Sequence, residues 1–254
     1  SRVWVRRLAL LALTLVIFQG VLGGQRVLRD DRRIAQLHGI VGPMFFAFAT
    51  ALAVWTSKWW IETHATLRGQ RGNEFSKYRG LAIVCWFTVL LAICQLVLGS
   101  FLRHGIEYVA ASAFRSAVLF HVVVAGLLML QSLWMAWRLR KTKREDRLRR
   151  PAAWIALFVV GQITLGVLSW AVKYGWPTIL EPWYSQPGFL VQSKSMVQSL
   201  IVTGHVALGA LILAVSVMVS MRSSRIAWAL AGEKETVKVD QSSPTMNSYV
   251  VGAN

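Results

Sequence analysis

The chain has 254 residues, 55% of them hydrophobic, and a formal net charge of +17. Soluble domains of this length seldom reach its mean hydropathy of +0.49. The long uninterrupted apolar blocks also argue against a transmembrane β-barrel, whose strands give short alternating segments. We therefore predict an all-α membrane protein. Because the basic residues gather between the apolar blocks, we expect no nucleic-acid partner.

Six apolar blocks are each long enough to cross the core of a lipid bilayer. Almost no charged residue interrupts them, and the charges collect in the connections. In chain order the blocks lie at roughly 5–25, 34–57, 81–102, 114–137, 152–172 and 196–221, against a requirement of about 20 residues per helix. We expect six transmembrane helices arranged as three helical hairpins, which make one full four-helix bundle and half of another.

The basic residues between the blocks predict the orientation of the chain. The connections at 58–80 and 138–150 are rich in Lys and Arg, whereas the connections after 102 and after 172 carry few. The positive-inside rule places the two basic connections and both termini in the cytoplasm. We expect the membrane to be of the bacterial inner type, with the histidines near its outer side. The connection between the first two blocks dissents mildly, because its arginines would lie outside.

These features divide the chain into three parts. Residues 1–78 form an N-terminal hairpin with its cytoplasmic connection, and residues 79–222 form the complete four-helix bundle. We expect the C-terminal segment, 223–254, to be a disordered cytoplasmic tail.

A short motif, Gln-x-x-Leu-Gly, occurs three times, each time near the predicted outer end of an odd-numbered helix. The copies are Gln19–Gly23, Gln95–Gly99 and Gln162–Gly166. Gln, Leu and Gly at these spacings share one helix face. A glycine there lets a neighbouring backbone or a flat cofactor come close, and a glutamine in hydrocarbon needs a polar partner.

A histidine follows each copy of the motif, in the first turns of the next helix. These are His38, His121 and His205. An ionisable residue inside a membrane is a functional candidate by default, although each could also be a hydrogen-bonded packing residue. A zinc site would need a cluster of ligands, and the sequence has no such spacing. A proton relay would need acidic residues within the spans, and the spans contain none. Haem iron needs one or two axial imidazoles from facing helices, which suits a helix bundle.

The second and third hairpins together offer His121 and His205 as an opposed pair of haem ligands. The first hairpin supplies His38, which has no evident partner. Two groups of neighbours complete the candidate site. Possible contacts for haem propionates, given the affinity of Arg for carboxylates, are Arg26, Arg103 and His104. Candidates for lining the haem pocket are Gln19, Gln95 and Gln162.

At these residues the chain resembles the haem A synthase family of membrane enzymes. The resemblance spans residues 5–221, and the order and spacing of the motifs carry it. The matching stretches are Gln19–Val27, Gln36–Gly39, Gln95–His104, Phe120–His121, Gln162–Gly166 and Thr203–Ala207.

The resemblance implies two four-helix bundles, a substrate bundle for haem O and a second bundle for haem b. It implies an oxidoreductase that converts the C8 methyl of haem O to the formyl group of haem A. His38 would then contact the substrate haem, and His121 and His205 would ligate haem b. The first two of the family's eight helices have no counterpart in 1–254, so the catalytic residue stays unassigned.

The expected partners are the lipid bilayer, haem O and the enzyme that produces it, an unidentified electron acceptor and a second copy of the chain. Two alternatives to the synthase remain open. One is a di-histidine haem b protein that carries electrons or handles haem without oxidising a methyl group. The other is a membrane protein without haem, in which the histidines only pack.

Overall fold

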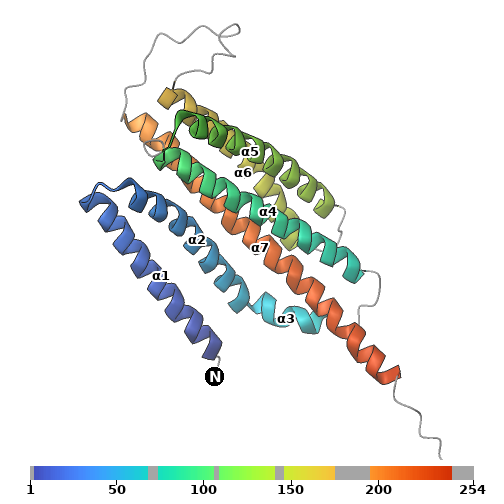
Figure 1. The fold of residues 1–254 in the computed structure, drawn as a ribbon. Helices are drawn as coiled ribbons and strands as arrows, with labels where there is room; N and C mark the ends of the chain where they lie inside the picture. The colour runs from blue at the N-terminus through green and yellow to red at the C-terminus, as the bar shows by residue number, and fades with distance from the viewer. Residues whose placement is uncertain (1–2, 68–73, 106–108, 141–145, 175–194, 242–254) are drawn as a thin grey trace, which may run out of the picture.

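A computed structural model of the chain describes residues 3–67, 74–105, 109–140, 146–174 and 195–241 (Figure 1). These residues are helical except for short connections. The helices are α1 (Val3–Leu28), α2 (Arg32–Thr56), α3 (Lys58–Leu67), α4 (Glu74–His104), α5 (Ala111–Arg140), α6 (Asp146–Tyr174) and α7 (Met196–Gln241).

Six of these helices are long and apolar enough to cross a membrane, namely α1, α2 and α4 to α7. Helices satisfy their own backbone hydrogen bonds, which is the condition for crossing hydrocarbon. The described residues contain no strand. The prediction of an all-α, multi-pass membrane protein is thus confirmed, and its expected partner, the lipid bilayer, follows from the apolar helices.

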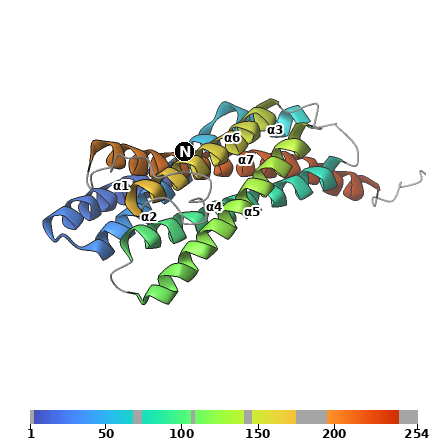
Figure 2. The same cartoon turned by 90° about the horizontal axis from the view of Figure 1, so that it is seen from above.

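Four of the helices close into a ring. Helix α4 packs on α5, α5 on α6, α6 on α7, and α7 returns to α4. The hairpin of α1 and α2 joins this ring through α2, which packs on both α4 and α7. Among the described helices, α1 packs on α2 alone and lies at one edge of the molecule (Figure 1). The helices run side by side in one elongated bundle (Figure 2). This is the expected full bundle with half of another.

The apolar core of the ring occupies only one half of its length. Its buried side chains come from 78–92 of α4, 128–139 of α5, 148–159 of α6 and 212–230 of α7. In the other half of these four helices, Ala117 and Ser100 are the only described residues that are fully buried within a helix. We call this second half the histidine end, because α4 finishes there at His104 and α5 and α7 enter the bundle there.

The structure differs from the sequence-based prediction in two connections. Helix α7 continues to Gln241, where we expected disorder from residue 223 onward. The reason lies in Ile226 and Leu230, which are buried one turn apart and extend the packed face of α7. Residues 242–254 of the predicted tail lie outside the described residues. The basic connection after α2 also contains a helix, α3, which packs on α2 and α7.

The core predicts where the chain is sensitive to truncation. Leu213 is 1% exposed, so Leu213→Ala should destabilise the fold by about 2–5 kcal/mol, through lost burial and the cavity it leaves. Leu130, 67% exposed, is the matched control and should tolerate the same change. Thermal unfolding in detergent measures both variants, and equal midpoints would contradict the packing described.

Candidate functional site

The turn between α1 and α2 sets where His38 enters the bundle. Asp31 caps α2, because its carboxylate accepts hydrogen bonds from the backbone N–H of Arg33 at 2.7 Å and of Ile34 at 3.2 Å. Asp30 precedes it in the left-handed region, with φ of 47°, which aspartate tolerates better than most residues. The sharp turn and cap therefore start α2 at Arg32, two turns before His38.

Each glycine of the repeated motif lies against the imidazole of the following helix. A Cβ built on Gly23 would lie 3.0 Å from Cε1 of His38. The same construction on Gly99 gives 3.3 Å to His121, and on Gly166 it gives 3.2 Å to His205. These separations are tighter than ordinary carbon contacts. The glycines are thus the residues that let the three rings lie close to the neighbouring backbone.

The glutamines of the first two motifs join the hairpin arms. Nε2 of Gln19 donates a hydrogen bond to the backbone oxygen of His38 at 3.0 Å. Nε2 of Gln95 donates in the same way to the backbone oxygen of His121, at 2.7 Å. In hydrocarbon such bonds satisfy polar groups that have no water to turn to. These two glutamines therefore fix the height of each histidine relative to the preceding helix.

The third hairpin holds its histidine differently. Nδ1 of His205 lies 3.1 Å from the backbone oxygen of Gln162, and Nε2 lies 3.3 Å from the side-chain nitrogen of the same residue. A carbonyl partner makes Nδ1 the protonated nitrogen, and the lone pair on Nε2 then accepts a hydrogen bond from the amide of Gln162, which a metal ion would have to replace. Metal-binding histidines commonly use this arrangement, donating one ring N–H to a carbonyl and ligating with the other nitrogen.

His38 and His121 are half-buried like His205, but their Nδ1 atoms are buried without a hydrogen-bond partner among the described residues. Buried polar atoms normally have such a partner. An imidazole nitrogen left in this state is available as a donor or as a metal ligand. His38 and His121 thus each keep a ring nitrogen without a hydrogen-bond partner, whereas both ring nitrogens of His205 contact Gln162.

Two of the histidines share the ring of α4 to α7. His121 from α5 and His205 from α7 lie close enough to interact electrostatically. His38 stands apart in the hairpin of α1 and α2, where its electrostatic neighbour is Arg26. The structure places His121 and His205 on two helices of the same ring and His38 outside that ring. Ligation by an opposed pair stays a prediction.

Positive charge gathers at the histidine end. His104 interacts electrostatically with Arg103, Arg26, Arg32 and Lys173, which come from four different helices. Sequence reasoning selected Arg26, Arg103 and His104 and missed the other two. The sequence could have indicated Arg32 and Lys173 through their position at the ends of α2 and α6, next to the apolar spans. Like charges brought together favour an anionic ligand, and carboxylates suit arginine.

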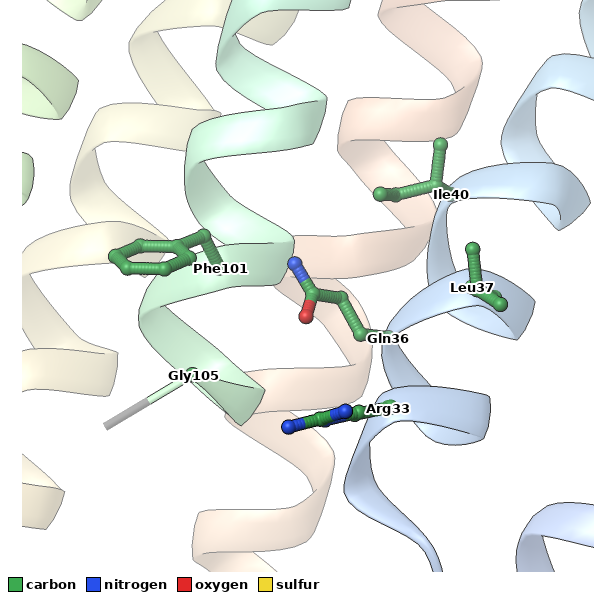
Figure 3. A pocket seen from close by; sticks show the side chains of 6 residues that line it. All are labelled: Arg33, Gln36, Leu37, Ile40, Phe101 and Gly105. Atoms are coloured by element: carbon green, nitrogen blue, oxygen red, sulfur yellow. The ribbon is translucent and has the colours of Figure 1, made fainter. Parts of the chain in front are cut away.

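A groove of about 390 Å³ opens at the same end, between α2 and α4 (Figure 3). Its lining is mostly apolar, and Gln36 reaches from α2 toward α4 with Arg33 beside it. Oγ of Ser100 donates to the backbone oxygen of Gln36 at 3.1 Å and joins the two helices there. The candidate histidines do not line this groove, so it is a seam between hairpin and ring and not the histidine site.

Comparison with protein-family models, with curated proteins and with solved structures finds no match to this chain. The fold and the site therefore define the class of protein. It is a polytopic α-helical membrane protein with three Gln–Gly–His hairpin units, two of which contribute their histidines from helices of one four-helix ring.

The contacts of the first motif predict a difference between two glycine substitutions. A Cβ on Gly42 would lie 2.7 Å from Nε2 of Gln19, so Gly42→Ala should displace the amide that bonds to His38. We expect a loss of about 1 kcal/mol of stability. Gly126 has open space around it, so Gly126→Ala should be neutral or mildly stabilising. Thermal unfolding decides, and a Gly42→Ala variant as stable as Gly126→Ala would argue against the hydrogen bond.

Proposed function

We propose that this chain is a membrane haem protein in which His121 and His205 ligate a haem b inside the ring of α4 to α7. The observation that carries the proposal is the presence of two half-buried imidazoles, close enough to influence each other electrostatically, in the half of the ring that lacks a packed core. Bis-imidazole ligation from facing helices is a common way for a bundle to hold haem.

The donor set of this half of the ring fits such a group. Two imidazoles would supply nitrogens for the iron, and the motif glycines let each ring lie against the neighbouring helix. The guanidinium of Arg103 would supply a charged partner for a propionate, with His104 beside it as a further N–H donor. When bound, haem b would supply reversible one-electron transfer. The residues of the chain would hold its iron, orient its carboxylates and exclude water with the bilayer-embedded helices.

We further propose that the activity resembles that of haem A synthases, the oxidation of the C8 methyl of haem O to a formyl group. His38 and Arg26 would bind the substrate haem beside the hairpin of α1 and α2. The support is the same unit of Gln, Gly and His in that hairpin, with a charge partner for one propionate. The proposed setting is an inner membrane of the bacterial type, with the histidine end outside and both termini in the cytoplasm.

A second function is favoured by one specific observation. Hairpin α1–α2 offers a single histidine, and α1 packs on α2 alone among the described helices. If this single histidine does not hold a substrate haem, the ring of α4 to α7 would still hold haem b. The protein would then serve as an electron carrier without methyl oxidation.

The histidine pair predicts a spectroscopic outcome. His121→Ala and His205→Ala should each remove most of the b-type haem spectrum of the purified protein, because each leaves one axial position without its imidazole. His64 in α3, at the opposite end of α2 from His38, is the control, and His64→Ala should keep the spectrum. Reduced-minus-oxidised difference spectra measure all three. A wild-type protein without haem, or two variants with full haem, would refute the assignment.

The same experiment separates the two candidate functions. His38→Ala should leave the b-type spectrum intact, because His38 lies outside the ring. If the chain oxidises haem O, this variant should lose at least tenfold in haem A formed, measured by chromatography of extracted haem. Wild-type protein that holds haem b but makes no haem A would leave only the electron carrier.

A further inference from the structure

A second groove lies at the end of the bundle opposite to the histidines. It has a volume of about 250 Å³ and lies between the start of α4 and the C-terminal part of α7. Arg79 lies just before the apolar run of α4, and Arg222 and Arg225 follow the apolar run of α7. Arg79 and Ser224, from these two boundaries, both line the groove. The groove therefore sits where two spans leave the hydrocarbon, at the level of lipid headgroups.

A cluster of tryptophans gives independent support for placing the groove at the level of the lipid headgroups. Trp4, Trp55, Trp60 and Trp228 form a chain of edge-to-face contacts, with ring centroids 6.2, 6.4 and 6.4 Å apart. The chain links α1, α2, α3 and α7. Indole rings prefer the membrane–water interface, so this cluster marks a headgroup layer. Trp228 belongs both to the cluster and to the lining of the groove.

The polar side of the groove suits an anion. Arg79 is exposed on its rim. Nε1 of Trp86 donates a hydrogen bond to Oγ of Ser224 at 3.0 Å, across α4 and α7. Because the serine oxygen accepts from the indole, its own proton is available to another acceptor. A guanidinium and a hydroxyl thus flank the same groove.

Two neighbouring arginines already have partners in the protein. Arg225 lies over the ring of Trp60, 5.2 Å from its centroid, and donates to the backbone oxygen of the same residue. Arg222 lies over Trp59 and donates to the backbone oxygen of Arg147 at 3.0 Å. These contacts hold both cations on α3 and α6. Arg79 has no such role among the interactions described and faces the groove.

The remaining lining is apolar and open to the surroundings. Ile83 is 63% exposed, and Trp86 and Trp228 are 45% and 61% exposed. Such surface on a membrane helix contacts acyl chains. The groove therefore offers a cation and a hydroxyl at headgroup level, with apolar side chains next to them in the direction of the bilayer core.

We propose that this groove binds one anionic phospholipid, with the phosphate of its headgroup on Arg79 and Ser224 and its acyl chains along Ile83 and Trp86. Charge complementarity selects the occupant: basic pockets between membrane helices at headgroup level recognise anionic lipids, and phosphate pairs well with guanidinium. The site is independent of the haem proposal, since it shares no residue with it.

The test uses the full chain reconstituted in vesicles of equal parts phosphatidylglycerol and phosphatidylcholine. After gentle extraction, native mass spectrometry measures the fraction of protein that retains one phosphatidylglycerol. Arg79→Gln should lower the retained fraction about fivefold, the worth of one cation near an anionic surface. Arg29→Gln removes the same charge from an exposed position at the histidine end and should leave retention unchanged.

Two further results decide the matter. Ser224→Ala should also lower retention, and the unfolding midpoint of each variant shows whether the fold is kept. Retention by Arg79→Gln equal to that of wild type would overturn the proposal. Equal retention of phosphatidylcholine and phosphatidylglycerol by the wild-type protein would overturn it as well, because the groove would then select no charge.

Discussion

The close approach of a glycine to an imidazole, repeated in three hairpins, is the constraint on which the site depends. Gly23, Gly99 and Gly166 stand so close to the histidine rings that a Cβ at any of them would require the ring to shift. In two hairpins a glutamine one turn away then bonds to the backbone of the histidine helix. One face of the first helix of each hairpin thus determines both how the two helices pair and where the imidazole lies. A substitution that separates the helices would also move the ring.

The ring of α4 to α7 divides its length between stability and binding. Fully buried Leu, Ile, Met and Val side chains fill one half, and this half carries most of the apolar packing. The other half keeps its histidines half-buried and gathers positive charge from four helices. Packing at one end can therefore hold the helices in place while the other end presents half-buried imidazoles next to positive charge. If the histidine end were packed as tightly as the other end, its imidazoles could not bind a ligand.

The six spans, their hairpins and the repeated motif could be predicted from the sequence, because hydropathy and spacing act locally. The extension of α7 was missed because Ile226 and Leu230 follow a charged stretch, and only their contacts show a packed face. Arg32 and Lys173 were missed because their closeness to His104 depends on how four helices meet. Gln162 contacts the ring of His205, whereas Gln19 and Gln95 bond to a backbone oxygen. This difference depends on the rotamer of His205, which the shared motif does not determine.

The central claim is that His121 and His205 jointly ligate one haem. The most direct measurement is pulsed electron–nuclear double resonance on the oxidised full-length protein, with histidine labelled in its ring nitrogens. Ligation by this pair should give a low-spin ferric centre coupled to two histidine nitrogens, at one such centre per chain. Protein whose haem centres all couple to a single histidine, or purified protein without iron, would contradict the proposed ligation.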